Sequence, residues 1–402
     1  MRAVIRPGTA RGTVAAPPSK SMAHRMLICA GLAVGESTVE GVDPSEDILA
    51  TIDCLEALGA SVRREGSTVF LRGCDPAEAA PAVLRCRESG STLRFLLPLC
   101  LLSGRSMRLE GSPTLLNRPL SVYETICRER GLRLEREDGS LTVQGILPSG
   151  DYALPGDISS QFVTGLLFAL PLLPEDSVLR LIPPVESRSY LDLTVAALSS
   201  AGIRPEMPDD NTFLISGNSA YRPGRTTVEG DYSNAAFFFG LNSLGGSVSV
   251  RGLNPESLQG DRICEQFFPL LESGSPTLDI ADCPDLAPVL FAVAALCHGA
   301  VFTGTRRLRF KESDRGSAMA EEMAKFGVAL RLEENRITVP ADIPRKPDAP
   351  LSSHNDHRIA MALSLLCSRT GGEILGAEAV RKSFPDYWDR LRSLGIPVTL
   401  ES

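Results

Sequence analysis

The apolar and polar positions of the chain follow a pattern that returns six times. Each time, an apolar segment with helical spacing ends at a glycine, and short alternating segments follow it. These glycines stand at intervals of 72, 71, 72, 53 and 68 residues: Gly59, Gly131, Gly202, Gly274, Gly327 and Gly395. A glycine after the last helical turn fits the left-handed conformation that ends a helix, and paired alternating segments predict a β-hairpin. The pattern predicts six copies of one α/β repeat, with the last three copies weaker.

A repeat of this size is too small to bury its own sheet. Three repeats are therefore expected to share one core, which predicts two domains of three repeats each. Pro17 and Pro18 force an extended path at one junction, and Gly230 permits a sharp turn at the other. The plainer alternative is an unrelated α/β fold in which six helices end at glycine by coincidence.

Composition narrows the class of protein. The chain has 402 residues, 43% of them hydrophobic and 22% charged, as is ordinary for a globular protein. The net charge of -8 argues against nucleic acid as the main partner. No apolar run approaches the roughly 18 residues of a membrane span, and the first residues lack the apolar core of a signal peptide. The ten cysteines form no CxxC pair, so we expect buried free thiols in a reducing cytoplasm.

One short segment concentrates charge in this acidic chain. The segment RFKESDRGS places five charged residues between Arg309 and Arg315, just before a predicted helix. Arginine suits bidentate recognition of carboxylate or phosphate, so the cluster predicts an anion site. Within it, Glu312 is either a base or a counter-ion for the cations. The alternative is an ordinary solvated face.

Four other predicted helix starts are unusually polar. Backbone N–H groups at a helix start favour an anion, and nearby cations and hydroxyls would add to this. A capped helix with solvated charges is the plainer interpretation of each, and His24 is expected to be solvent-facing or packed rather than catalytic. The segments are PPSKSMAHR at residues 17–25, RESGST at 87–92, GDISSQF at 156–162 and SSHNDHR at 352–358. Sites of this kind in both halves suggest a cleft for a polyanionic substrate.

Taken together and in order, nine motifs resemble the EPSP synthase family. They are PPSKSMAHR, SGSTLR, NRP, SSQF, ESRSYLDLT, PD at Asp285, KESDR, NDHRIAMA and KSFPDYW, and they run from Lys20 to Trp388. The resemblance implies a two-domain, inside-out α/β barrel fold of six βαβαββ-type repeats, three per domain. It implies one domain at residues 17–229, and a second at 1–16 plus 230–402 that the N-terminal strand completes.

The resemblance also implies a reaction. The enolpyruvyl group of phosphoenolpyruvate would pass to the 5-hydroxyl of shikimate 3-phosphate by addition and elimination, releasing phosphate. We expect no cofactor, no metal, no nucleic acid and no membrane, a monomer, and inhibition by glyphosate. Catalytic roles carry over to Lys20, Asp285, Glu312 and His357. Contacts to phosphoenolpyruvate carry over to Lys20, Gly90, Arg118, Gln161, Arg315, Arg358 and Lys382. Contacts to shikimate 3-phosphate carry over to Lys20, Ser21, Arg25, Ser159, Ser160, Gln161, Ser187, Tyr190, Asp285 and Lys311.

The sequence departs from the family pattern in two places. It has ESGST around Gly90, where many members have NAGTA, and Arg307 stands where some members have an asparagine that contacts shikimate 3-phosphate. One alternative is a UDP-N-acetylglucosamine enolpyruvyl transferase, but that enzyme carries a reactive cysteine in a loop that here reads EGSPTLLNRPL. Another alternative is a non-enzymatic repeat scaffold, which would not need charged clusters at helix starts.

Overall fold

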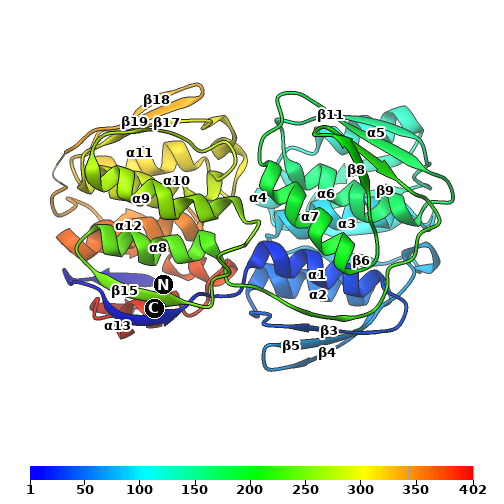
Figure 1. Ribbon diagram of the computed structural model, residues 1–402, viewed down its shortest axis with the longest axis horizontal. Helices are drawn as coiled ribbons and strands as arrows, with labels where there is room; N and C mark the ends of the chain where they lie inside the picture. Colours follow the sequence, from blue (N-terminus) through cyan, green and yellow to red (C-terminus); the bar gives the residue numbers. More distant parts are fainter. Residues whose placement is uncertain (343, 402) are drawn as a thin grey trace. The chain divides into compact units, whose positions relative to one another are not determined.

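The computed structural model describes residues 1–342 and 344–401. The chain divides into two compact units, each with its own apolar core. Pro18–Glu229 form what we call the middle unit. Met1–Pro17 and Gly230–Ser402 form the terminal unit, which contains both ends of the chain (Figure 1).

One repeat of the middle unit shows the plan of all the complete ones. It consists of β6 (Val83–Arg85), α3 (Gly90–Cys100), β7 (Met107–Glu110), α5 (Ser121–Arg130), β8 (Arg133–Glu137) and β9 (Ser140–Gln144). The first two strands are parallel, and the hairpin β8–β9 adds antiparallel, giving the order β6-β7-β9-β8. Met107 and Leu109 alternate with exposed positions and pair with buried Val143 and Leu141, so one face of the sheet is apolar.

The other two repeats of the middle unit follow the same plan. One consists of β10 (Asp151–Pro155), α6 (Ser160–Ala169), β11 (Ser177–Ile182), α7 (Arg188–Ser200), β12 (Glu206–Asp209) and β13 (Thr212–Ile215). The other consists of α1 (Lys20–Leu32), β3 (Glu36–Glu40), α2 (Glu46–Ala57), β4 (Ser61–Glu65), β5 (Thr68–Arg72) and β14 (Arg225–Thr227). Strand β14 comes from the end of the unit but pairs parallel to β3, so it supplies the first strand of this repeat.

The terminal unit contains one complete repeat and one that the N-terminus completes. The complete repeat has β16 (Thr277–Asp279), α10 (Ala287–Leu296), β17 (Ala300–Thr303), α11 (Arg315–Ala324), β18 (Arg331–Glu333) and β19 (Arg336–Val339). The other has β20 (Leu351–Ser352), α12 (His357–Thr370), β21 (Gly372–Leu375), α13 (Tyr387–Ser393), β22 (Val398–Glu401) and β1 (Arg2–Ile5). Strand β1 lies between β21 and β22, so the first residues of the chain provide the missing hairpin strand.

The remaining repeat corrects one expectation. It has β2 (Arg11–Ala15), α8 (Tyr232–Ser243), β15 (Ser247–Arg251) and α9 (Cys264–Ser273), and its sheet has two strands. The hairpin predicted after Gly274 is wrong, because the segment that follows is β16, the first strand of the next repeat. Gly274 is extended with φ 174°, whereas the other five repeat glycines have φ between 68° and 114°. The missing hairpin explains why the interval from Gly274 to Gly327 is the short one.

Helices occupy the interior of each unit and sheets cover the outside (Figure 1). In the middle unit α3 packs on α6 and α1 packs on α7, and in the terminal unit α10 packs on α12 and α8. Every residue of α10 from Ala287 to Ala295 is buried, as a helix that is apolar all round requires. This arrangement confirms the predicted inside-out α/β fold, with five four-stranded sheets and one two-stranded sheet among the described residues.

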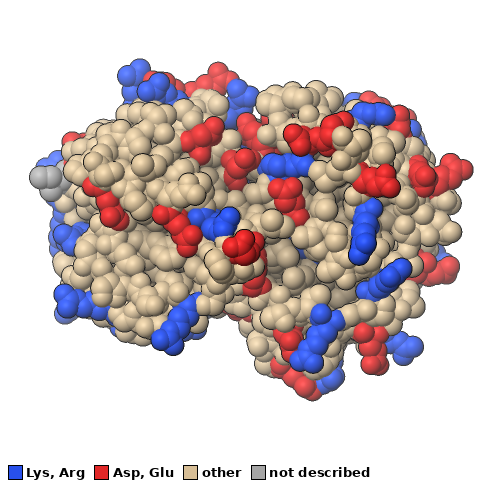
Figure 2. All heavy atoms as spheres, in the orientation of Figure 1, with Lys and Arg blue, Asp and Glu red and all other residues tan. Residues whose placement is uncertain are grey.

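The surface and the cysteines add two observations. Basic and acidic side chains are interspersed on the drawn face of each unit, without a continuous basic stripe there (Figure 2). All ten cysteines are free thiols, and eight of them are buried. Among the helices of the described residues, none is both long and apolar enough to cross a membrane.

Candidate active site

The predicted site residues of the middle unit gather at helix starts. Ser19 caps α1 by accepting a hydrogen bond from the Met22 amide. Lys20 is the first residue of the helix, and its Nζ lies 2.7 Å from Asp47 Oδ2. A cation at a helix start is opposed by the helix dipole, and the Asp47 carboxylate offsets that repulsion. The Lys20 side chain is only 14% exposed, so the ion pair is well shielded.

Arg25 connects two elements of this site. Its Nε donates to Thr194 Oγ1 at 2.8 Å, and its two Nη atoms donate to the carbonyls of Ser21 at 2.6 Å and Tyr190 at 3.0 Å. Burial lowers the pKa of Arg25 to about 10. These bonds fix Ser21 on α1 beside Tyr190 on α7. Neighbouring His24 is buried, its Nδ1 lies 2.7 Å from Thr51 Oγ1, and burial and the Lys20 charge lower its pKa.

A second group surrounds the start of α3. A Cβ atom on Gly90 would lie 2.8 Å from Arg118 Nη1, 3.4 Å from Arg94 Nη1 and 3.8 Å from Gln161 Oε1. Arg94 Nη1 donates to Gln161 Oε1 at 2.6 Å, and Gln161 Nε2 donates to Ser91 Oγ at 3.0 Å. None of the described residues accepts a hydrogen bond from the buried Arg118 Nε. Two guanidinium groups at a helix start are suited to hold an anion.

Serine hydroxyls mark the starts of α6 and α7. Ser159 caps α6 by accepting from the Gln161 amide at 3.3 Å, and Ser160 is buried beside it. Ser187 precedes α7 and is buried, with a left-handed φ of 58°. A non-glycine residue held in that conformation is strained, and such strain concentrates at functional sites.

In the terminal unit, the side chain of Arg315 is the centre of a buried charge cluster. It is 1% exposed, and its guanidinium contacts three carboxylates. Nε lies 2.9 Å from Asp356 Oδ2, Nη1 lies 2.7 Å from Asp285 Oδ1, and Nη2 lies 2.8 Å from Glu312 Oε2. Arg315 therefore joins the KESDR motif to two segments that are distant in the sequence.

Asp285 also contacts the other two cations of the cluster. Lys311 Nζ lies 3.1 Å from its Oδ1, and Arg358 Nη2 lies 3.3 Å from its Oδ2. Burial alone would raise the pKa of Asp285, but Lys311, Arg358 and Arg315 outweigh it and hold the pKa well below its usual range. Burial lowers the pKa of Lys311 despite the nearby Asp285 carboxylate.

The start of α12 supplies the other side of the cluster. Asp356 caps the helix by accepting from the Arg358 amide at 2.9 Å. The Arg358 guanidinium donates to the carbonyl of Ser233 at 3.1 Å and to its hydroxyl at 2.7 Å. His357 is buried, with Nδ1 3.8 Å from Asp356 Oδ1. Lys382 Nζ donates to the carbonyl of Asn355 at 2.6 Å, at the turn that leads into the helix.

The structure thus brings predicted site residues together around α1 and α7, around α3 and α6, and around Arg315 of the terminal unit. It also adds residues that the sequence analysis did not assign. Arg94 lies beside Gly90, and its position one turn later on the same helix was the available signal. Asp356, which had no assigned role, caps α12 and also binds Arg315. Asp261, in the 3-10 turn Gly260–Ile263, is buried near Asp285 and Arg358, and burial together with the Asp285 charge raises its pKa to about 7. No local pattern marked it.

The chemistry of these groups defines a class of protein. The two units place cations and serine hydroxyls at helix starts and a buried carboxylate among cations. Such groups are typical of an enzyme that acts on small phosphorylated or carboxylated molecules. The sequence identifies the family. The sequence model of EPSP synthase (3-phosphoshikimate 1-carboxyvinyltransferase) matches residues 5–268 and 269–391.

Relatives and solved structures agree with that match. The chain is 39% identical to a 3-phosphoshikimate 1-carboxyvinyltransferase of Clostridium kluyveri, covering 97% of this chain and 96% of the relative. It is 37% identical to that of Clostridium perfringens, covering 98% of each. The structure of EPSP synthase from Acinetobacter baumannii has the same fold, with a TM-score of 0.79, 22% identity and full coverage of both chains. The chain belongs to the EPSP synthase family, and it is an enzyme rather than a repeat scaffold.

Proposed function

We propose that this enzyme transfers the carboxyvinyl group of phosphoenolpyruvate to the 5-hydroxyl of shikimate 3-phosphate, releasing phosphate. Membership of the family and the names of its relatives support this reaction over transfer to UDP-N-acetylglucosamine. The observation that carries the proposal is the buried cluster in which Asp285 contacts Lys311, Arg315 and Arg358. Such a cluster offers a base and cations together, as an addition between two anionic substrates requires.

The reaction needs three proton transfers. In the addition, C3 of phosphoenolpyruvate takes a proton, C2 becomes electron-poor, and the substrate hydroxyl attacks C2 while losing its proton. In the elimination, C3 loses a proton and the C–O bond to phosphate breaks. We assign Asp285 to the hydroxyl proton and Glu312 to the proton at C3. Lys20 takes part in proton transfer, and His357 has a supporting role.

The state of Asp285 gives a physical reason for coupling binding to chemistry. Three cations hold this carboxylate ionised, which makes it a weak base in the free enzyme. An anionic ligand that draws Lys311 or Arg358 toward itself would weaken these contacts. The basicity of Asp285 would then rise only when substrate is present.

Residues of both units are assigned to each substrate. We assign phosphoenolpyruvate to Lys20, Gly90, Arg118, Gln161, Arg315, Arg358 and Lys382. We assign shikimate 3-phosphate to Lys20, Ser21, Arg25, Ser159, Ser160, Gln161, Ser187, Tyr190, Asp285 and Lys311. The approach of Arg118 and Gln161 to Gly90 supports the first assignment. The left-handed backbone of Ser187 supports the second, because strain of this kind is retained where a site needs it.

The test is phosphate release from purified enzyme given both substrates, beside a Glu312→Gln variant. Glutamine keeps the size of the side chain but cannot exchange a proton. We expect release by the wild type and a loss of about 100-fold or more in the variant. Release with little loss in the variant would return Glu312 to a structural role. Absence of release with shikimate 3-phosphate, but release with UDP-N-acetylglucosamine, would overturn the proposed acceptor.

Three finer properties also belong to this proposal. Glyphosate would inhibit in competition with phosphoenolpyruvate, because Gly90 leaves open the space that a side chain would fill beside Arg118. A steady-state assay at several phosphoenolpyruvate concentrations checks this, and absence of competition would contradict it.

The enzyme would act as a monomer in the cytoplasm, where ten free thiols stay reduced.

A further inference from the structure

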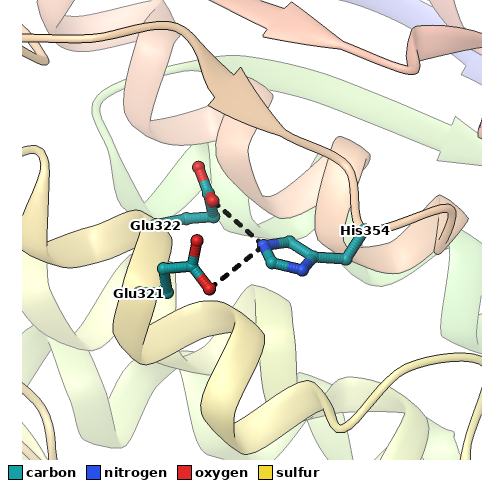
Figure 3. A group of neighbouring side chains, drawn as sticks. All are labelled: Glu321, Glu322 and His354. Carbon is teal, nitrogen blue, oxygen red and sulfur yellow. Dashed lines mark hydrogen bonds and ion pairs between the residues drawn. The ribbon is translucent and has the colours of Figure 1, made fainter.

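A cluster outside the assigned residues joins α11 to the turn before α12. Glu322 on α11 is fully buried, and His354 Nε2 lies 2.9 Å from its Oε1 (Figure 3). Glu321, on the same helix, has Oε2 4.0 Å from the same ring nitrogen. Because a carboxylate only accepts hydrogen bonds, His354 Nε2–H is the donor of this hydrogen bond and Glu322 Oε1 is its acceptor.

These three side chains offer potential metal ligands within 4.8 Å of one another, but the surroundings favour a different role. Lys325 Nζ lies 2.9 Å from both oxygens of Glu322, and the Ser352 amide donates to Oε2 at 2.9 Å. Each Glu322 oxygen thus already accepts two hydrogen bonds. A divalent cation would have to displace the Lys325 ammonium from a buried carboxylate. The cluster is therefore built as a closed hydrogen-bonded support.

The turn that contains His354 has a backbone conformation that neighbouring contacts must stabilise. His354 and Asn355 have φ of 48° and 54°, two successive residues in the left-handed region. Non-glycine residues adopt this conformation only where surrounding contacts hold them. The His354 amide donates to Ser352 Oγ and the Asn355 amide donates to Ser353 Oγ, so the backbone is bonded locally. The His354 ring adds a side-chain contact from this turn to α11, beside the Ser352 amide that donates to the same Glu322.

The turn positions groups that the proposed function uses. The Asn355 carbonyl accepts from Lys382 Nζ at 2.6 Å. The next residue, Asp356, caps α12 and binds Arg315, and Arg358 follows on the first turn of the helix. A displaced turn would therefore move Lys382 and Arg358 together.

We propose that the Glu322–His354 hydrogen bond is a latch that positions the phosphoenolpyruvate-binding groups of the terminal unit. The inference rests on the proposed function, since it takes Lys382 and Arg358 to bind that substrate. His354 and Glu322 touch no substrate in this assignment, so both are positioning residues. Their loss should weaken phosphoenolpyruvate binding more than it slows turnover.

The decisive variant is His354→Asn. Asparagine tolerates the left-handed backbone, but its side chain is too short to reach Glu322, so the hydrogen bond is lost without new backbone strain. We expect KM for phosphoenolpyruvate to rise about 10-fold, as for the loss of one charge-assisted hydrogen bond. KM for shikimate 3-phosphate and kcat should change less than about 3-fold. His354→Gln can present its amide nitrogen near the position of Nε2, and it should restore most of the affinity.

His298→Asn is the matched control. His298 is an exposed histidine of the same unit whose Nε2 lies 3.1 Å from the Glu272 carbonyl, outside the assigned residues. It should leave both KM values unchanged. An unchanged KM for phosphoenolpyruvate in His354→Asn, with an active wild type, would overturn the latch alone. A turnover that falls on dialysis against a chelator and returns with Zn²⁺ would also overturn it, in favour of a metal role.

A second readout does not depend on activity. Hydrogen exchange of a peptide spanning residues 353–358 should speed up at least about 5-fold in His354→Asn and stay at the wild-type rate in His298→Asn. Unchanged exchange in His354→Asn would show that the ring does not hold the turn. If the wild type fails to turn over both substrates, the proposed function is wrong, and this exchange measurement still decides whether the turn is latched.

Discussion

The two units hold their buried arginines in different ways, although Lys20 of the middle unit also pairs with a carboxylate, that of Asp47. In the middle unit, Arg25 and Arg94 are fixed by neutral oxygens, from Thr194, Gln161 and backbone carbonyls. In the terminal unit, Arg315 is fixed by three carboxylates, and Asp285 is shared among three cations. Neutral partners leave positive charge available for an anionic ligand, whereas carboxylates neutralise it beforehand. Under the proposed function, the first group would attract an anion, and the second would exchange partners when an anion arrives.

This difference decides what each arginine contributes to the free enzyme. Burying a charge is unfavourable unless a partner compensates it, and removing one partner leaves the other exposed to the full penalty. Arg315 has three such partners. By contrast, no described residue accepts a hydrogen bond from Arg118 Nε. Loss of Arg315 should therefore lower the free energy of unfolding. Loss of Arg118 should instead lower ligand affinity and leave the free energy of unfolding nearly unchanged.

The largest effect is expected for Arg315→Met. Methionine fills much of the space but leaves Asp285, Glu312 and Asp356 without their shared cation, which should lower the free energy of unfolding by about 3–5 kcal/mol. Phosphate release should fall at least about 100-fold. Urea unfolding followed by circular dichroism measures the first effect. A variant as stable as the wild type would show that the carboxylates do not depend on Arg315.

The counterpart in the middle unit is Arg118→Met. No carboxylate of the described residues pairs with this arginine, so the free energy of unfolding should change by less than about 0.5 kcal/mol. The expected loss is in affinity, with KM for phosphoenolpyruvate rising roughly 10- to 100-fold, since a charge-assisted hydrogen bond contributes about 1.5–3 kcal/mol. Steady-state kinetics and the same urea titration test both parts. A large loss of stability would remove the contrast between the units.

The repeat architecture was predictable from the sequence because it depends on local signals. Five of the six repeat glycines have the left-handed φ that a helix end requires. Gly274 is the exception, and the sequence contained a hint in the short interval that follows it. The N-terminal strand between β21 and β22 is a long-range pairing, and neither periodicity nor turn residues indicate such a partner.

Some residues of the candidate site could likewise be predicted from local motifs, and others could not. Local motifs brought out Lys311, Glu312 and Arg315, which are neighbours in the chain. The other two carboxylates that contact Arg315, those of Asp285 and Asp356, come from 30 and 41 residues away, so no spacing rule could connect them. Asp261 lay outside every motif. His354 stood inside one, but its partner Glu322 lies 32 residues upstream, so the contact appears only in the folded chain.

The smallest effect concerns pH and tests whether the terminal unit is as tightly charge-coupled as its contacts indicate. Burial and the Asp285 charge raise the pKa of Asp261 to about 7, against the lowering effect of Arg358. The unfolded chain releases this proton near pH 3.9, so the folded state binds more protons between roughly pH 4 and 7. Stability from this group is therefore present at low pH and is lost as pH rises through that window.

An Asp261→Asn variant removes this titration while keeping the size of the side chain. The difference in unfolding free energy between variant and wild type should shift in favour of the variant by on the order of 1–3 kcal/mol between pH 5 and pH 8. Urea titrations of both proteins at several pH values measure it, and because only the difference is compared, other titrating groups cancel. Parallel pH profiles would mean that Asp261 is ionised throughout. Its negative charge would then add to that of Asp285. The cations of the terminal unit would be neutralised even more fully, and the contrast with the middle unit would be larger.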